Sequence, residues 1–260
     1  SIYMSIPLSI IKQEDYTSSP LLARLLELHN IPKQLYLKGN LPEITIDEYG
    51  RATPRILAII GSRKYTNYGK QCLGKLLNTL QGEDVIILSG LAYGIDILAH
   101  TGALKNNLAT IAIPGSGLDA KSIYPRTHLD VAQEIVEKGG LLLSELSPET
   151  GPAKWTFPSR NRIVAALSDA ILVVEASDKS GALITARQAL ELGRDIGAIP
   201  GDIFSPTSVG TNMLIRDGAY SITNSEDLFA LLHLSKQQGE KIITEKYTDD
   251  EQSILNILNE

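Results

Sequence analysis

The sequence predicts an α/β protein built on a parallel-dominated, doubly wound sheet, and two observations lead to this fold class. Short runs such as DAILVVEA (169–176) are apolar at nearly every position, which is typical of strands buried on both faces. Between such runs lie segments such as SGALITARQALELG (180–193), where apolar residues recur at helical spacing before a glycine stop signal. Regular alternation of strands and helices predicts parallel strands with covering helices.

The individual elements follow from the same patterns, taken in chain order. A short amphipathic helix is predicted over 18–30, beginning at a serine cap, and a strand over 34–40 that adds to the sheet. Residues 41–54 are predicted to be a polar connection. The strands of the main sheet are predicted at 56–62, 84–90, 108–115, 140–145, 169–176, 194–201 and 219–223. The helices are predicted at about 68–80, 95–106, 128–138, 157–168, 180–193 and 225–234.

These elements divide the chain into three parts. They are an N-terminal extension (1–54), the main α/β domain (55–234), and a linker with one helix (235–260). The last helix opens with a capping-box pattern, Thr248 and Glu251, but a single helix cannot fold alone. It is therefore expected either to dock on the main domain or to begin a truncated module.

Composition sets further limits on the class of protein. The 260 residues are 43% hydrophobic and 21% charged, and no apolar run approaches the roughly 18 residues of a membrane span, so no membrane partner is expected. The first residues lack the positive region of a signal peptide, and the single cysteine, Cys72, excludes an internal disulfide and any multi-cysteine metal site. A cytoplasmic protein is expected. The net charge of −6 argues against a nucleic-acid coat but permits a local basic cleft.

Glycine-rich turns follow several of the predicted strands. They are GSR (61–63), SGLAYG (89–94), PGSG (114–117) and SG (180–181). Any one of them would be an ordinary tight turn, but parallel strands bring all of them to one edge, where such folds bind ligands. Glycine lets the backbone approach phosphate, and the following helices supply N–H groups. No GxGxxG or GxxxxGK[ST] motif is present, so nothing supports a nucleotide triphosphate site.

Basic side chains are predicted at the same edge. They are Arg63, Lys154, Arg160, Arg162 and Lys179. Singly each would be a solvated surface charge, but together they would attract a polyanion. Arg160 to Arg162 are predicted at a helix start, where free N–H groups strengthen an anion site. Phe157 would either stack on a nucleobase or pack under its own helix, and Trp155 is expected to cover a loop.

The sequence contains no convincing catalytic constellation. Asp96 and His100 lie four residues apart on a helix and are expected to form a structural hydrogen bond without a third partner. Glu145 and Glu175 end strands, but no nucleophile accompanies them, and Cys72 is expected in the core. No catalytic residue, metal site or cofactor is therefore predicted.

Several long motifs together carry a resemblance to a known family. GSRKYTNYGK, SGLAYGIDILAH, GSGLDAKSIYPRTH, LLLSE, FPSRNRIVAALS, EASDKSGALITARQALELGR and GTNMLIRDGA, in this order, resemble the DNA-processing protein A (DprA/Smf) family from about Leu35 to Phe229. The resemblance implies an extended Rossmann-like domain that binds single-stranded DNA without sequence preference. It also implies a homodimer that loads the bacterial recombinase RecA in natural transformation or recombination, and no enzymatic activity.

The resemblance also implies which residues contact DNA. They are Gly61, Ser62, Arg63, Gly115, Lys154, Phe157, Arg160, Asn161, Arg162, Lys179, Ser180 and Gly181. Three departures stand out. Tyr93 occupies a position where many relatives have arginine, residues 1–34 are too short for a whole helical N-terminal module, and 248–260 resembles only the first helix of a winged helix.

Two alternatives remain open at the level of the sequence. A nucleotide sensor or a phosphoribohydrolase-like enzyme would use a related fold, but such enzymes carry PGGxGTxxE, and PGSGLDAKS lacks the GT and the glutamate. The helix over 225–234 has more apolar residues than one buried stripe needs. It is expected at the dimer interface, unless these residues are buried within the monomer.

Overall fold

Seven parallel strands form the centre of the structure, a computed structural model that describes Tyr3 and residues 6–234. In chain order they are β5 (Arg55–Ile60), β6 (Val85–Ser89), β7 (Ala109–Ala112), β8 (Leu141–Ser144), β9 (Ala170–Val173), β10 (Asp195–Ala198) and β11 (Tyr220–Ser221). The complete sheet has the order β1-β2-β8-β7-β6-β5-β9-β10-β11. The predicted parallel-dominated α/β sheet is confirmed.

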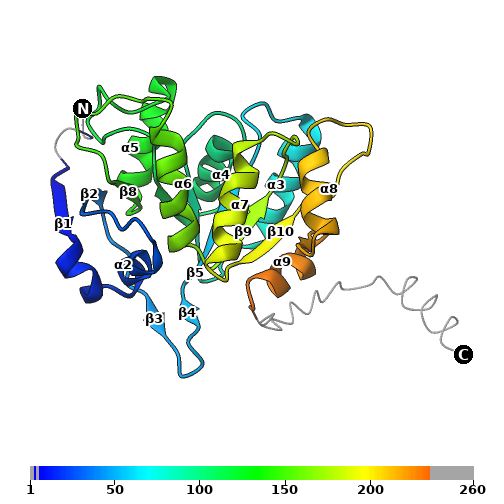
Figure 1. Cartoon of the computed structure of the whole chain (residues 1–260), viewed down its shortest axis with the longest axis horizontal. Coiled ribbons are helices and arrows are strands. Elements are labelled where there is room, and N and C mark those ends of the chain that lie inside the picture. Colours follow the sequence, from blue (N-terminus) through cyan, green and yellow to red (C-terminus); the bar gives the residue numbers. More distant parts are fainter. Residues whose placement is uncertain (1–2, 4–5, 235–260) are drawn as a thin grey trace, which may run out of the picture.

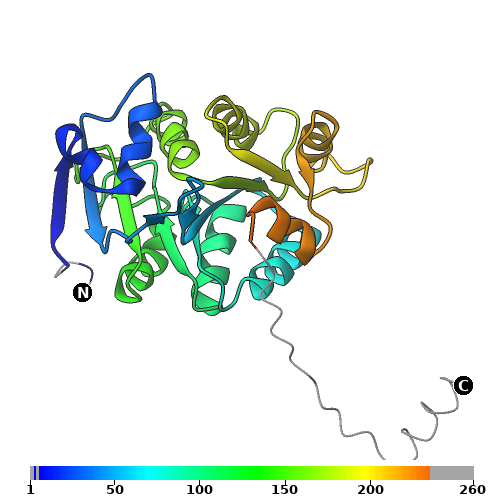
Figure 2. The ribbon, with the colours of Figure 1, turned by 90° about the horizontal axis from the view of Figure 1, so that it is seen from below.

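The strand order reverses between β5 and β9, which are paired in parallel although more than 100 residues separate them. Helices cover both faces of the sheet (Figures 1 and 2). One face carries α2 (Pro20–Ala23), α6 (Thr156–Leu167), α7 (Gly181–Glu191) and α8 (Val209–Arg216). The other carries α3 (Asn67–Thr79), α4 (Ile95–Lys105), α5 (Leu129–Glu137) and α9 (Ser225–Leu231). The sheet is thus doubly wound, as predicted.

The N-terminal segment extends the sheet beyond β8. The predicted strand over 34–40 is confirmed as β2 (Gln34–Gly39), which pairs antiparallel with β8. β1 (Leu8–Lys12) pairs antiparallel with β2 at the edge and was not predicted. A 3-10 helix, η1 (Gln13–Ser18), follows, and the helix predicted over 18–30 consists of α2 and a 3-10 turn, η2 (Arg24–Glu27). Ser19 occupies the N-cap position of α2, as predicted, but its side chain makes no capping hydrogen bond.

The segment predicted as a polar connection contains a short hairpin, β3 (Thr45–Ile46) and β4 (Ala52–Thr53), which projects from the lower side in Figure 1. Its turn is closed by Asp47, whose Oδ1 accepts hydrogen bonds from the backbone N–H groups of Tyr49 (2.9 Å) and Arg51 (2.8 Å). A 3-10 turn, η3 (Arg126–His128), precedes α5. None of the helices in the described part is long and apolar enough to cross a membrane.

Helix α9 is packed into the monomer. Leu228, Leu231 and Leu232 are fully buried on the face of the sheet that also carries α3, and Phe229 is buried too. The alternative reading of this helix is therefore correct, and its apolar residues do not form an exposed dimer surface. The predicted helix over 248–260 lies outside the described residues.

A cluster of charges joins the N-terminal segment to the sheet. The carboxylate of Asp169, directly before β9, lies 3.0 Å from Arg24 Nη2 and 3.3 Å from Arg55 Nη1. Its second oxygen accepts a hydrogen bond of 2.7 Å from the backbone N–H of Ile56. All three charged side chains are almost buried, with 10–12% of their side-chain surface exposed. Asp169 therefore holds both η2, through Arg24, and β5, through Arg55, next to the start of β9.

Candidate functional site

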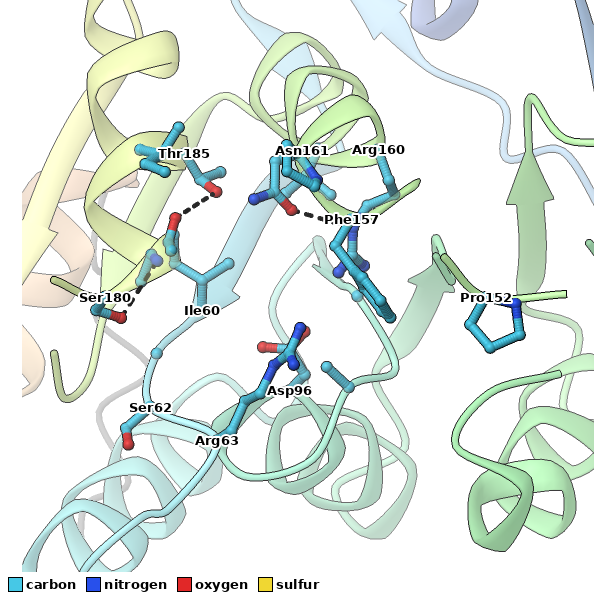
Figure 3. Close-up of a pocket in the computed structure, with 18 of the residues that line it drawn as sticks. Ile60, Ser62, Arg63, Asp96, Pro152, Phe157, Arg160, Asn161, Ser180 and Thr185 are labelled. Atoms are coloured by element: carbon cyan, nitrogen blue, oxygen red, sulfur yellow. Dashed lines mark hydrogen bonds between the residues drawn. The ribbon is translucent and has the colours of Figure 1, made fainter. Parts of the chain in front are cut away.

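A cleft of about 830 Å³ opens where β5 and β9 end, at the point where the strand order reverses (Figure 3). One wall is the turn after β5 together with the turn after β6. The other is formed by the first turns of α6 and by the segment that joins β9 to α7. The structure therefore confirms that glycine-rich turns from separate strands meet at one edge of the sheet, where doubly wound folds bind their ligands.

Most of the predicted DNA-contacting residues line this cleft. Nine of the twelve do so: Gly61, Ser62, Arg63, Lys154, Phe157, Arg160, Asn161, Ser180 and Gly181. Gly115, Arg162 and Lys179 do not belong to its lining. Tyr124 lines the cleft although it was not predicted. The sequence gives only a weak signal for it, a tyrosine before proline in a loop that follows a strand.

Arg63 and Phe157 lie together at the mouth of the cleft. The exposed guanidinium of Arg63 lies 4.8 Å from the centroid of the half-buried Phe157 ring, a cation–π contact. Gly115 lies behind the ring, because a Cβ at this position would be 2.6 Å from Phe157 Cδ1. Gly115 therefore shapes the cleft without lining it. Phe157 packs against both residues and still forms part of the wall.

Arg160 has a different position from the one predicted. Helix α6 begins at Thr156, whose hydroxyl donates to the carbonyl of Gly115 (2.7 Å), so Arg160 lies in the second turn and not at the helix start. Pro158 fits the first turn because its missing N–H would have no helical partner there. Arg160 is buried, with 7% of its surface exposed, and its guanidinium donates to the carbonyl of Ile113 and lies against Gly90. Arg160 therefore forms the floor of the cleft.

The floor also contains a buried carboxyl group, Asp96. Burial raises the pKa of Asp96, whereas the positive charge of Arg160 and hydrogen bonds from the backbone of Ala92 and Gly90 act in the opposite direction. Burial likewise lowers the pKa of Arg160, and Asp96 opposes this change. The two groups thus compensate each other's charge, and Arg160 contributes little free charge to a ligand.

The predicted hydrogen bond between Asp96 and His100 is wrong. His100 Nδ1 instead lies 2.8 Å from Thr110 Oγ1, whose hydroxyl donates to the carbonyl of Ile87. Burial, together with the charge of Arg160, lowers the pKa of His100 to about 3. This histidine is therefore neutral and belongs to the core.

The remaining basic side chains predicted at this edge differ in whether an ion pair neutralises their charge. Arg162 pairs with Glu145, whose other oxygen accepts a hydrogen bond of 2.6 Å from Ser159, so its charge is already neutralised. Lys154 and Lys179 are exposed and form no ion pair within the part of the chain that the structure describes. Trp155 is 61% exposed, so the expectation that it covers a loop is wrong.

The helix N-terminus that faces the cleft is that of α7. Ser180 caps it, with Oγ accepting from the backbone N–H of Ala182 (3.3 Å), and both Gly181 and Ala182 line the cleft. The N-terminal end of a helix favours an anion. Within the described ranges, no group of three or more His, Cys, Asp or Glu side chains is placed to hold a metal ion.

Comparison with known proteins places the chain in a family. The model of the DNA recombination-mediator protein A family matches residues 8–233. The chain belongs to this family. Among curated members of the family, it is 41% identical to DNA processing protein DprA of Bacillus subtilis over 205 residues, which are 79% of this chain and 66% of the relative. It is 40% identical to protein Smf of Escherichia coli over 79% of this chain and 52% of that relative. The chain thus spans about half to two thirds of their length.

Solved structures of DprA proteins share the fold. The X-ray structure of DprA from Streptococcus pneumoniae matches with a TM-score of 0.74 and 35% identity, over 88% of this chain and 75% of that one. DprA from Helicobacter pylori, whose structure gives insights into its single-stranded DNA binding mode, matches with a TM-score of 0.70 and 32% identity. That match covers 88% of this chain and 96% of the other. The Rossmann-like architecture expected from the DprA resemblance is confirmed.

Proposed function

We propose that this chain is a recombination mediator that binds single-stranded DNA, without sequence preference, in the cleft between the turns after β5 and β6 and the first turns of α6 and α7. The observation that carries the proposal is the pair of Arg63 and Phe157, a free guanidinium on an aromatic ring at the mouth of a glycine-lined cleft. Proteins that bind single strands combine such charges with aromatic rings. The Helicobacter pylori relative, which binds single-stranded DNA, supports the proposal.

The phosphates would be held by two kinds of group. Arg63, Lys154 and Lys179 supply free positive charge, and the α7 N-terminus at Ser180 and Gly181 supplies backbone N–H groups. Gly61 and Ser62 let the backbone come close, and Asn161 offers an amide from the opposite wall. Arg160 and Arg162 act indirectly, by holding the floor of the cleft and the position of α6.

The preference for an unpaired strand would come from the aromatic wall. A duplex hides the faces of its bases, whereas a single strand exposes them for stacking. No histidine or cysteine lines the cleft, and its buried carboxyl group is compensated by Arg160, so we assign the cleft a binding role and no catalysis.

Titration of labelled oligo-dT against increasing salt tests this function. Arg63→Ala and Lys154→Ala are each expected to weaken binding and to flatten the log–log salt dependence by about 0.7, the value for one lost phosphate contact on a single strand. Phe157→Leu is expected to weaken binding at every sequence alike without changing the salt slope, since it removes a ring and no charge.

The matched control is Lys12→Ala, because Lys12 is an exposed lysine on the edge strand β1 and is not part of the cleft. It is expected to change neither affinity nor slope. Equal affinity for duplex and single strand, or unchanged slopes in both cation variants, would contradict the proposal. Stronger binding of a mononucleotide than of oligo-dT would favour the nucleotide-sensor alternative.

We also propose that the bound strand is passed to RecA in the cytoplasm during DNA uptake or recombination. The membership of the recombination-mediator family supports this step. The test is RecA filament assembly on oligo-dT covered by single-strand-binding protein, which the chain is expected to accelerate. An unchanged assembly rate would restrict the function to DNA binding.

A homodimer is the last part of the proposal. Within the described residues β11 ends the sheet without an outer neighbour, and Tyr220 on it is 44% exposed, which leaves an edge that a second copy could cover. Light scattering at tens of micromolar is expected to give the mass of two chains. The mass of a single chain at that concentration would refute the dimer.

A further inference from the structure

A row of aromatic rings leads out of the cleft. The ring of Tyr124 lies 6.1 Å from that of Phe157, and the ring of Tyr93 lies a further 6.4 Å away (distances between centroids). The row ends at His128, 5.1 Å from Tyr93. Interplanar angles of 64° to 84° make all three contacts edge-to-face, a geometry in which each contact engages only one face of one of its two rings.

The two tyrosines are the accessible members of this row. Tyr93 is 44% exposed and Tyr124 is 38% exposed, whereas His128 is buried. Phe157 is half-buried, and the guanidinium of Arg63 already lies over its ring. No cation lies over either tyrosine ring, and neither hydroxyl forms a hydrogen bond with any residue that the structure describes.

Free positive charge accompanies the tyrosines. Lys121 lies three residues before Tyr124 on the same loop, Arg126 lies two residues after it at the start of η3, and both are exposed. Neither forms an ion pair with another residue in the described ranges. Exposed rings with cations beside them are the combination that holds successive bases and phosphates of a single strand.

We propose that Tyr93 and Tyr124 form a second base-binding subsite, continuous with the cleft, for single-stranded DNA. The inference rests on the proposed function of the cleft and extends it. A strand that enters beside Arg63 and Phe157 would continue over Tyr124 to Tyr93, across the loops that follow β7 and β6. The site would thus hold a longer strand than the cleft alone.

The test compares oligo-dT of increasing length with the wild-type chain and with Tyr93→Ala/Tyr124→Ala. Wild-type affinity is expected to rise with length until the tyrosines are covered. The affinity of the double variant is expected to stop rising at a shorter length. Its binding of the longer oligonucleotide is expected to be at least about tenfold weaker, the effect of one lost stacking contact near the lower end of the usual range. Its salt slope is expected to match the wild type, since no charge is lost.

Two controls separate stacking from a structural effect. Tyr93→Phe/Tyr124→Phe keeps both rings and is expected to bind all lengths like the wild type, because the hydroxyls have no partner. An oligonucleotide with abasic sites at the end that reaches the tyrosines is expected to bind the wild type more weakly but to leave the alanine variant unaffected.

The results of these measurements show separately whether the tyrosine subsite and the cleft bind DNA. Undiminished binding of the longer oligonucleotide by the alanine variant would overturn the subsite and leave the cleft in place. An equal loss at every length, with a changed salt slope, would mean that the tyrosines only support the loops, which also overturns it. Failure of the wild type to bind any oligonucleotide would overturn the cleft and the subsite together.

Discussion

Gly94→Ala is expected to lower the free energy of unfolding by about 3 kcal/mol, because two unfavourable effects coincide at this residue. Its φ of +85° lies in the region that side chains avoid. In addition, a Cβ here would overlap the carbonyl oxygen of Ser62 and lie 2.5 Å from the Cα of Arg63. The same Ser62 carbonyl accepts a hydrogen bond from the first backbone N–H of α4, that of Ile95 (3.0 Å).

Urea denaturation gives the measurement, and Gly82→Ala gives the matched control. Gly82 has nearly the same φ, +86°, but nothing lies within 4 Å of the position of its Cβ. Gly82→Ala should therefore cost only about 1–2 kcal/mol of backbone strain. Since Ser62 and Arg63 form one wall of the cleft, Gly94→Ala should also weaken DNA binding, which Gly82→Ala should leave intact. Equal losses of stability in both variants would show that the contact with Ser62 is unimportant.

Asp169→Ala is expected to destabilise the fold by about 3–5 kcal/mol, as is usual when one partner of a buried ion pair is removed. The change leaves two arginines, Arg24 and Arg55, without their carboxylate in a place where only 12% of each side chain reaches solvent. It also removes the acceptor of the Ile56 N–H.

Two further variants test whether the loss of stability comes from the buried charges around Asp169. Asp169→Asn can still accept from Ile56 and should lose less than the alanine variant. Asp217→Ala removes an ion pair with Arg216 in which both partners are more than half exposed, and a surface pair of this kind contributes about 0–1 kcal/mol. A midpoint of unfolding for Asp169→Ala that is as high as that of Asp217→Ala would contradict the role given to Asp169.

Most strands that the sequence predicted correctly are almost completely buried, and β11, whose two residues are exposed, is the exception. The strand within 169–176 is buried on both faces, and so its composition alone identified it. Strand β1 lies at the edge and three of its five residues are exposed, which leaves no comparable apolar run. The hairpin at 45–53 depends on hydrogen bonds of Asp47, and its two-residue strands are too short to show a period.

The residues of the cleft likewise differ in whether the sequence pattern determines their position. Its place at the carboxyl edge follows from the parallel topology, and Arg63 could be predicted because it directly follows a strand. Arg160 could not be separated from Arg162 in this way. Which of the two turns toward Gly90 and which toward Glu145 is decided only when α6 packs on the sheet. Tyr124 belongs to the cleft through a long loop whose course the sequence pattern does not specify.

The reversal of strand order between β5 and β9 has an evolutionary consequence. The turn after β5 and the segment after β9 meet at this reversal, and apart from Ile60 the residues that line the cleft lie beyond the last residue pair of these strands, Ile60 and Val173. Insertions or substitutions in one wall can therefore change the width and charge of the cleft while the pairing of β5 with β9 is preserved. Selection can thus alter ligand preference at exposed wall positions such as Lys154, whereas Gly94, which packs against the Ser62–Arg63 wall, constrains stability and binding together.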